Sequence, residues 1–176
     1  MKELHLFGAS TSTGKYLMNK LNNDFSFKVF PYSKSNPLYS NIDFNDSSCF
    51  EINSTKSSVW VSLAPIWLFA NFLNHLCKKN NSALNNLRGL IVCSSTSIIT
   101  KKFSFNSFDK NLYSSLLLGE RMITSDCQRK KIPLVILRPT MIYGNLQELE
   151  DKNLSKILKI MSISPILPLP SNSGLR

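Results

Sequence analysis

The 176-residue chain has few of the residues that build metal sites and disulfide frameworks. It has two histidines and four cysteines, Cys49, Cys77, Cys93 and Cys127, none of them in a CxxC pair. His75 and Cys77 are two residues apart, but no second ligand pair follows at the spacing of a zinc site. We therefore expect no metal site, and we predict that the cysteines are reduced and mostly buried thiols.

Long apolar runs are also absent. The longest candidate, residues 59–72, is broken by Pro65, so no segment of the sequence is long enough to span a membrane. The N-terminal MKELHLFGAS has one lysine and then a short apolar run. That run is too short for a secretory signal and is typical of a strand. These observations predict a cytoplasmic protein with no membrane partner.

Acidic residues are scarce. The chain has 11 Asp and Glu against 21 Lys and Arg, which gives a formal net charge of +10. Such a balance can indicate a nucleic-acid-binding protein. The basic residues are scattered, however, and no RNP, KH or zinc-finger pattern accompanies them. We expect solvated basic faces that attract an anionic cofactor, and no nucleic-acid partner.

What the sequence does contain is a regular alternation of strand-like and helix-like segments. Its length and its 43% hydrophobic composition are sufficient for one domain with a sizeable core. The apolar patterns predict strands over residues 2–7, 25–32, 59–63, 90–93 and 134–137, and helices over 14–21, 66–79, 111–131 and 154–161. This order predicts an α/β fold with a doubly wound parallel sheet, which binds ligands at the carboxyl ends of its strands.

Polar or turn-forming residues follow every one of these strands. In chain order they are Gly8; Ser33 and Lys34; Ser62 to Pro65; Ser94 to Thr96; and Arg138 to Thr140. The carboxyl ends of parallel strands meet at one edge of a sheet, so we expect these residues to line one site.

Glycine is scarce as well, with six in the chain, and two of the six enclose the first predicted turn. Residues 9–15, ASTSTGK, nearly match a mononucleotide P-loop, but Tyr16 stands where a P-loop has its magnesium-binding hydroxyl. Counted from Gly8, the stretch reads G-x-x-G-x-x-G with Thr11 at the middle glycine. In this dinucleotide interpretation Gly8 makes the turn and Gly14 lets the helix pack against the strand. The helix N-terminus then faces a pyrophosphate.

Thr11 is the departure from the dinucleotide pattern. Its Cβ keeps a phosphate further from the backbone, but neighbouring hydroxyl groups could replace the lost contacts. These hydroxyl groups belong to Ser10, Thr11, Ser12 and Thr13. The third strand ends in VWVSLAP, without an acidic magnesium ligand, so the dinucleotide interpretation is favoured. A P-loop-like nucleotidase stays as an alternative.

The choice between NAD and NADP depends on the end of the second strand, KVFPYSK. It contains no acidic residue that could bond the ribose 2′-hydroxyl of NAD. Ser33 and Lys34 suit a 2′-phosphate instead, which predicts NADP as the preferred cofactor and NAD as the other candidate. The alternative is that Lys34 is an ordinary surface lysine after a strand.

Taken together, the motifs resemble those of extended short-chain dehydrogenases/reductases, the NAD-dependent epimerase/dehydratase family. The resemblance rests on LFGASTSTGKYL, IDFND, VSLAP, LIVCSSTS and, most specifically, VILRPTMIYG, in the order of the family. It implies an NAD(P)-binding Rossmann fold, a nucleotide sugar or related small molecule as substrate, and the option of a homodimer. The chain would be an atypical member of that family.

The resemblance also implies roles for individual residues. Asp43 would contact the adenine, with Phe44 beside it, and Leu63, Ala64 and Pro65 would line the cofactor. Pro139 would end the fifth strand beside the nicotinamide. As alternatives, an Arg-Pro pair is an ordinary strand terminator, and a threonine at a strand end is an ordinary turn residue.

In that family a tyrosine acts as general acid/base, a lysine four residues later lowers its pKa, and a Ser/Thr steadies the substrate hydroxyl. Thr96 matches the Ser/Thr and Tyr113 is the candidate tyrosine. Leu117 occupies the lysine position, and Lys110, three residues before Tyr113, is the candidate substitute. Tyr113 could equally be a helix residue that packs on the sheet. Catalysis is therefore in doubt, and a non-catalytic dinucleotide-binding or redox-sensing protein is the main alternative.

The sequence ends in SNSGLR, at a point where relatives in this family continue. The resemblance therefore implies a C-terminally truncated chain that lacks most of the substrate domain. We expect a Rossmann domain over residues 1–164, followed by an irregular tail over residues 165–176.

Overall fold

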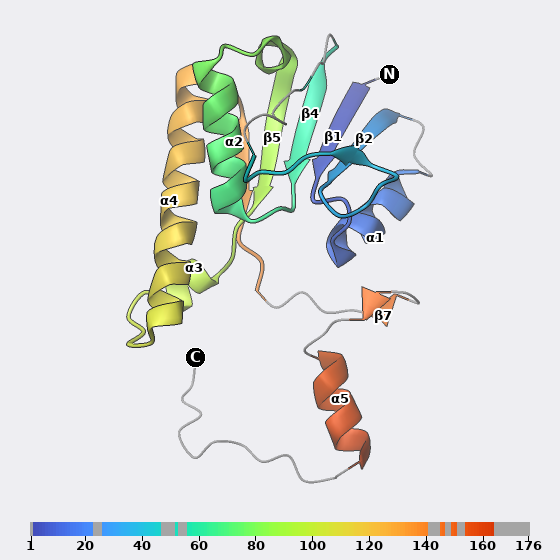
Figure 1. Cartoon of the computed structure of the whole chain (residues 1–176), viewed down its shortest axis with the longest axis vertical. Coiled ribbons are helices and arrows are strands. Elements are labelled where there is room, and N and C mark those ends of the chain that lie inside the picture. The colour runs from blue at the N-terminus through green and yellow to red at the C-terminus, as the bar shows by residue number, and fades with distance from the viewer. Residues whose placement is uncertain are drawn as a thin grey trace. The chain divides into compact units, whose positions relative to one another are not determined.

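A computed structural model describes residues 2–22, 26–46, 52, 56–140, 145–146, 149–150 and 154–163 (Figure 1). The chain divides into two compact units, Met1–Thr140 and Met141–Arg176. The domain boundary expected at residue 164 stays a prediction, and the tail over residues 165–176 lies outside the described residues.

The first unit contains a six-stranded sheet in the order β3-β2-β1-β4-β5-β6, and all neighbouring strands are parallel. The strands are β1 (Lys2–Phe7), β2 (Phe27–Ser33), β3 (Ser40–Asn41), β4 (Ser58–Ser62), β5 (Leu87–Cys93) and β6 (Leu134–Leu137). At the carboxyl end of β1, Phe7 lies between Tyr32 of β2 and Ser62 of β4. The predicted parallel α/β fold is confirmed.

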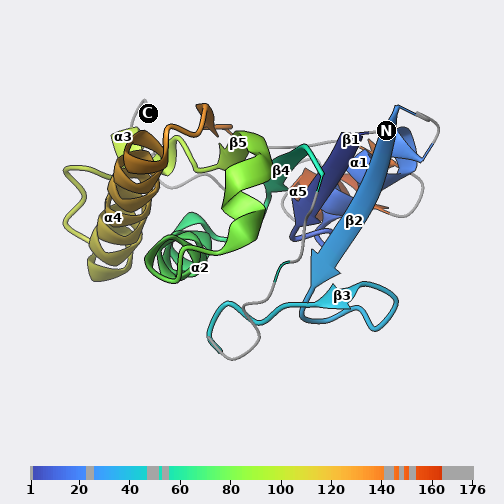
Figure 2. The same cartoon turned by 90° about the horizontal axis from the view of Figure 1, so that it is seen from above.

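Helices cover both faces of this sheet (Figure 2). They are α1 (Ser12–Leu21), α2 (Ile66–Lys78), α3 (Ser97–Thr100) and α4 (Ser107–Lys130), together with a 3-10 helix over Ser82–Asn86. On one face, α2 and α4 pack against each other and against the larger core cluster. On the other face, Leu17 and Leu21 of α1 pack against Leu4 and Leu6 of β1. This two-sided cover is what a doubly wound sheet requires.

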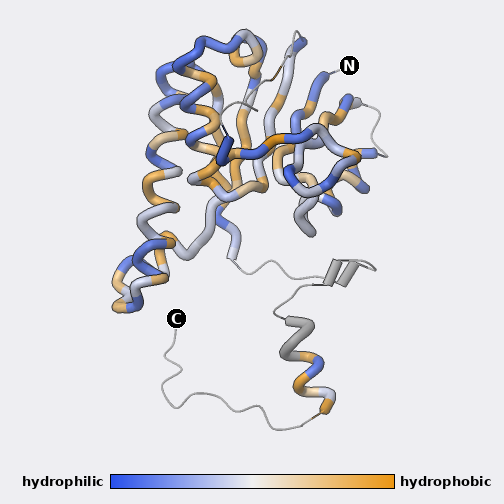
Figure 3. Tube along the Cα trace, in the orientation of Figure 1, coloured by the Kyte–Doolittle hydropathy of each residue, from blue (hydrophilic) through white to orange (hydrophobic). Residues whose placement is uncertain are grey.

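The central strand β1 is buried on both faces, as its apolar sequence predicts (Figure 3). Phe7 points into an aromatic cluster, where its ring centroid lies 5.4 Å from that of Trp60, 5.2 Å from Phe69 and 5.5 Å from Phe72. Aromatic rings packed at such distances contribute strongly to a core. The cluster fixes the end of β1 from which the candidate site begins.

Several elements differ from the sequence prediction at their ends. Helix α4 begins at Ser107 rather than at residue 111, because the Asn106 side chain caps it by accepting from the Phe108 N–H at 2.8 Å. Strand β5 begins at Leu87 rather than at residue 90, although Arg88 and Gly89 interrupt the apolar run. The short strand β3 and the 3-10 helix were not predicted, because neither is long enough to show a hydrophobic period.

The second unit contains helix α5 (Leu154–Ile163) and a two-stranded antiparallel ladder of β7 (Asn145–Leu146) and β8 (Leu149–Glu150). The predicted helix over 154–161 is thus confirmed and slightly longer. None of the described helices in either unit combines the length and the apolar character needed to cross a bilayer.

The cysteines are free thiols wherever the structure describes them. Cys77 and Cys127 are buried and Cys93 is half-buried, while Cys49 lies outside the described residues. Burial raises the pKa of all three described thiols, that of Cys127 to about 12. They therefore stay protonated and behave as small apolar groups. Within the described part of the chain, no three His, Cys, Asp or Glu side chains are grouped to hold a metal.

Candidate functional site

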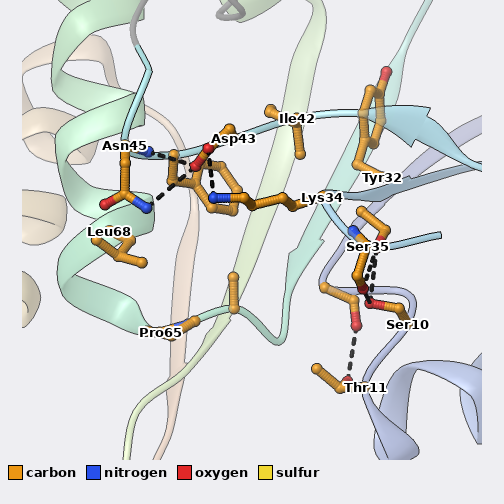
Figure 4. Close-up of a pocket in the computed structure, with 14 residues that line it drawn as sticks. Ser10, Thr11, Tyr32, Lys34, Ser35, Ile42, Asp43, Asn45, Pro65 and Leu68 are labelled. Atoms are coloured by element: carbon orange, nitrogen blue, oxygen red, sulfur yellow. Dashed lines mark hydrogen bonds and ion pairs between the residues drawn. The ribbon is translucent and has the colours of Figure 1, made fainter. Parts of the chain in front are cut away.

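A cavity of about 190 Å³ opens at the carboxyl edge of β1, β2 and β4 (Figure 4). It brings together many of the residues predicted to bind a cofactor: Gly8, Ser10, Thr11, Ser33, Lys34, Asp43, Phe44, Ala64 and Pro65. The other predicted cofactor residues, Ser12, Thr13, Gly14, Leu63 and Pro139, lie outside its lining. Tyr32, Ser35, Ile42, Asn45 and Leu68 also line it and were not predicted.

Gly8 holds the two turns of this cavity close together. Its backbone is left-handed, with φ of 79°, and a Cβ at this position would lie 2.9 Å from the Ala64 nitrogen and 3.0 Å from the Leu63 carbonyl carbon. The Leu63 N–H donates to the Phe7 carbonyl at 2.9 Å and keeps the turn after β4 in place. The position therefore accepts only glycine, and the backbone approach matches the close turn that a dinucleotide motif requires.

Gly14 has the packing role predicted from the sequence. It lies buried within α1, where a Cβ would collide with the Gly8 carbonyl oxygen and lie 2.8 Å from the backbone of Ala9. The helix thus rests directly on the turn that precedes it. This close contact agrees with the packing role that the dinucleotide interpretation gives to Gly14.

Thr11, at the position of the missing middle glycine, is the N-cap of α1. Its hydroxyl accepts from the Gly14 N–H at 3.1 Å and donates to the Gly8 carbonyl at 2.8 Å. Its φ of −66° is ordinary for a residue with a side chain. The hydroxyl therefore stabilises the turn itself rather than standing free for a ligand. Ser12 and Thr13 follow in the first helical turn, whose N–H groups have no partner within a helix and favour an anion.

Three serines tie the end of β2 to the glycine turn. The hydroxyl of buried Ser33 donates to Ser10 Oγ at 2.8 Å, and Ser35 Oγ donates to the same oxygen at 3.2 Å. Ser33 Oγ also accepts from the Ser35 N–H at 3.1 Å. Ser33, which the sequence assigned to a 2′-phosphate, is thus engaged inside the protein. Ser35 was missed, although it directly follows the Ser33-Lys34 pair that the sequence singled out.

Lys34 and Asp43 form an ion pair across the cavity. Lys34 Nζ lies 2.7 Å from Asp43 Oδ2, and the Lys34 side chain is 66% exposed. Asp43 Oδ1 accepts from the backbone N–H of Asn45 at 3.0 Å and from its side-chain amide at 3.2 Å. The hydrogen bond from Lys34, followed by that from the Asn45 backbone, lowers the pKa of Asp43. The cavity therefore presents one hydrogen-bonded carboxylate and one exposed cation, which pair with each other.

The remaining walls are largely apolar. Tyr32 contributes its ring, and its hydroxyl points away from the cavity in Figure 4. That hydroxyl forms a hydrogen bond of 3.0 Å with Nδ1 of the buried His5 ring. Burial, together with the charge of Glu3, raises the pKa of Tyr32 to about 12. Ile42 and Leu68 complete these walls. Apolar walls with a few fixed polar groups suit a planar heteroaromatic ring joined to phosphate.

Thr96 and Pro139, predicted from different segments, meet at the ends of β5 and β6. The backbone N–H and the hydroxyl of Thr96 both donate to the Pro139 carbonyl, at 3.1 Å and 3.2 Å. The ends of β5 and β6 therefore also meet at the carboxyl edge of the sheet, as predicted. The Thr96 proton is directed to the backbone, while its oxygen keeps lone pairs that can accept a hydrogen bond.

The other candidate catalytic residues lie on α4. Tyr113 and Leu117 are half-buried and pack against the larger core cluster, whereas Lys110 is exposed one turn before Tyr113. Like Thr96, they lie outside the lining of the cavity. The packing of Tyr113 and Leu117 matches the structural alternative that the sequence left open for this tyrosine.

An ion pair between buried Glu120 and exposed Arg138, near these residues, was not predicted. The guanidinium of Arg138 donates to both carboxylate oxygens of Glu120, with Nε at 2.9 Å, and joins α4 to the end of β6. Burial alone would raise the pKa of Glu120, but the hydrogen bonds from Arg138 and its charge outweigh burial and lower the pKa. The LRP motif drew attention to Arg138, but nothing in the sequence identified Glu120 as its partner.

Comparison with known proteins supports the fold. No protein-family model matches the sequence, and no curated protein matches it. Among solved structures, UDP-N-acetylglucosamine 4-epimerase from Bacillus cereus is 16% identical, with a TM-score of 0.64 over 91% of this chain and 66% of that one. UDP-glucuronic acid 4-epimerase from the same organism, in complex with UDP-glucuronic acid and NAD, is 17% identical, with a TM-score of 0.63 over 90% and 63%.

A dehydratase shows a similar degree of structural likeness at low sequence identity. dTDP-glucose 4,6-dehydratase from Bacillus anthracis, in complex with NAD, is 11% identical, with a TM-score of 0.62 over 94% of this chain and 62% of that one. The chain thus spans between 58% and 66% of the length of the first three solved structures it matches. At these identities the likeness establishes architecture. This chain has the Rossmann-like α/β fold of nucleotide-sugar epimerases and dehydratases, as the resemblance of its motifs implied.

Proposed function

We propose that this chain is an NAD(P)-binding protein of the extended short-chain dehydrogenase/reductase type, and that the dinucleotide binds in the cavity beside Gly8. The observation that carries the proposal is the backbone approach at Gly8, where a Cβ would meet the turn after β4 at 2.9 Å. Two turns held this close, next to a helix N-terminus and an apolar-walled cavity, suit a pyrophosphate and an aromatic base.

We expect different residues to hold different parts of the proposed dinucleotide. Asp43 and Phe44 would hold the adenine end together with Pro65. The first-turn N–H groups of α1 would hold the pyrophosphate. Pro139 and Thr96 would lie toward the nicotinamide end, at the ends of β5 and β6. When bound, the cofactor supplies hydride transfer, which no side chain can supply.

We further propose a preference for NADP over NAD. Lys34 supplies the positive charge among the residues that line the cavity, and it lies at the end of β2, where the ribose is held in dinucleotide-binding sheets. Lys34 pairs with Asp43, so it can bind the 2′-phosphate only if its side chain leaves this carboxylate. The side chain is highly exposed, so breaking the pair costs little free energy.

For chemistry, the candidates are Thr96 to orient a substrate hydroxyl, Tyr113 as general acid/base and Lys110 as its cationic neighbour, acting on a nucleotide sugar or a related small molecule. A second function, dinucleotide binding without turnover, is favoured by a specific observation. At the lysine position stands Leu117, which packs with Tyr113 against the core. A leucine can neither lower the pKa of a tyrosine nor bond a ribose.

Isothermal titration of the purified chain with NADPH, NADH and Mg-ATP tests the proposal. We expect heat from both dinucleotides, tighter binding of NADPH and none of Mg-ATP. Absence of dinucleotide binding by a chain that is folded by circular dichroism would refute it, and binding of Mg-ATP alone would favour the P-loop alternative. Incubation with cofactor and UDP-sugars then separates the two functions, because the second predicts binding without any turnover.

A further inference from the structure

The connection between α3 and α4 exposes aromatic rings that have no role in the cavity. Phe103, Phe105 and Phe108 are 81%, 97% and 71% exposed, and Ile99 of α3 is exposed beside them in sequence. Lys102 and Lys110 belong to the same stretch, KKFSFNSFDK. We refer to these six residues as the aromatic–basic tip.

The tip is braced by its own polar side chains. Asp109 forms an ion pair with Lys101 and accepts from Ser104 Oγ at 3.0 Å. The Asn106 N–H donates to Ser104 Oγ at 3.2 Å, and the Asn106 side chain caps α4. The polar groups of the loop are thus used to hold its backbone, while the phenylalanines face solvent. This is the reverse of the ordinary partition of polar and apolar groups, and a fixed loop that exposes aromatic rings indicates an interaction surface.

The charge of the tip has one sign. Asp109 is the only acidic residue between positions 97 and 119, and its charge is paired with Lys101. Lys102 and Lys110 are therefore among the positive charges that give the chain its formal net charge of +10. Lys102 Nζ lies 5.1 Å from the centre of the Phe103 ring, so charge and aromatic surface are presented together.

The tip lies at an outer end of the first unit. Figures 1 and 2 both show the connection between α3 and α4 there, with no other described segment of that unit beyond it. Hydrophilic and hydrophobic residues alternate along it in Figure 3. Exposed side chains at such an end can reach the surface of a bilayer.

We propose that the aromatic–basic tip binds the surface of an anionic lipid bilayer. This differs from the expectation of no membrane partner, which rested on the lack of a spanning segment and not on the surface. Phenylalanines favour the boundary between headgroups and acyl chains, and lysines near the surface contribute about 1 kcal/mol each toward anionic lipid. A neutral apolar surface would match the phenylalanines but would offer the lysines no opposite charge. A hydrated polyanion would match the lysines but would leave the phenylalanines in water. The inference is independent of cofactor binding, because the tip shares no residue with the cavity. Of the six residues, Lys110 is also a candidate catalytic residue.

Co-flotation with vesicles tests this proposal. The probes are vesicles of phosphatidylcholine with or without phosphatidylserine, at low salt and at high salt. We expect flotation with the anionic vesicles only, weakened by salt. Replacing Phe103, Phe105 and Phe108 together by serine should lower the bound-to-free ratio by about tenfold or more. The double change Lys102→Gln and Lys110→Gln should lower it on anionic vesicles by a similar factor.

Leu38→Ser is the matched control. Leu38 is an equally exposed hydrophobic residue in the loop after β2, so its loss should leave flotation unchanged. Failure of the folded wild-type chain to float, or equal flotation of the triple variant, would overturn the proposal. Two further outcomes would assign the tip to another partner, each of them with flotation unchanged in the triple variant. Loss of dimerisation, measured by light scattering, would assign the tip to a second copy of the chain. Loss of single-stranded DNA retention would assign it to nucleic acid.

Discussion

The carboxyl edge of the sheet has two sides, and only one of them lines the cavity. On the cavity side, at the ends of β1, β2 and β4, the turn at Gly8 packs closely on the turn after β4, and the paired Lys34 and Asp43 line the cavity. On the α4 side, at the ends of β5 and β6, the polar groups bond to one another outside the cavity lining. Thr96 donates to Pro139, and Arg138 donates to Glu120.

We propose that this difference separates cofactor binding from catalysis. The close backbone packing around Gly8 and Gly14 suits a dinucleotide, although Thr11 stands at the position of the middle glycine. Tyr113 and Leu117, by contrast, are half-buried residues that pack against the larger core cluster. The two sides depend on different segments of the chain, so we expect that one can change without the other.

The largest effect should come from the closest backbone contact on the cavity side. Gly14→Ala places a Cβ against the Gly8 carbonyl, which cannot move aside, so we expect a loss of about 2 kcal/mol of stability after the gain in helix propensity. Dinucleotide binding should be lost with it. Gly89→Ala is the control, because its Cβ would meet no atom within 4 Å. Equal melting temperatures for the two variants would contradict the packing role of Gly14.

A smaller loss of stability, about 1 to 2 kcal/mol, is expected from Glu120→Gln on the α4 side. The value is at the low end for a buried pair because Arg138 is partly exposed and can return to solvent. The folded-state pKa of Glu120 is lowered, so its contribution is present above the unfolded-state pKa of about 4.3 and is lost as the pH falls below it. Thermal melts against pH should show a flatter acid limb in the variant. Cofactor affinity should not change. A large loss of affinity would show that the cavity side depends on the α4 side.

Cofactor selectivity should respond to the Lys34–Asp43 pair. Lys34→Gln is expected to weaken NADPH by about fivefold, or about 1 kcal/mol, and to leave NADH unchanged, because only NADPH carries the 2′-phosphate. Asp43→Asn releases Lys34 and should raise the ratio of NADPH to NADH affinity, even if the adenine contact weakens for both. Titration of both variants measures these ratios. A ratio that is the same in wild type and both variants would exclude Lys34 from recognition.

The smallest effect is expected at the tyrosine. Tyr113→Phe removes a hydroxyl from a half-buried residue whose ring packs on the core, so stability should change by less than about 0.5 kcal/mol and cofactor affinity not at all. Lys110→Gln, at an exposed position of the same helix, is the companion variant. If the chain binds a dinucleotide without turnover, both variants should behave like the wild type in titration and with UDP-sugars. A hundredfold loss in Tyr113→Phe alone would show that the tyrosine is catalytic after all.

The elements that the sequence predicted well are those with a strong local pattern. The strand over residues 2–7 and the helix beginning at Ile66 have continuous or periodic apolar residues, and both are found where expected. The role of Gly14 followed from motif spacing, because close approach of helix and strand leaves a recognisable glycine.

What the sequence could not provide are the side-chain partners. Ser33 and Lys34 are adjacent in the chain, yet one is buried against Ser10 and the other pairs with Asp43. Glu120 finds Arg138 only after α4 has packed on the sheet. Such pairings depend on the three-dimensional arrangement of distant segments, which no local period or motif encodes.

The most direct test is a crystal structure of the chain grown with saturating NADPH, because it shows whether the cavity side binds the cofactor while the α4 side stays packed. We predict the adenosine end in the cavity beside Asp43 and Pro65, the pyrophosphate at the N-terminus of α1, and Lys34 turned from Asp43 to the 2′-phosphate. Tyr113 should stay packed against the core. A dinucleotide bound elsewhere, or none in a well-ordered crystal, would contradict the account.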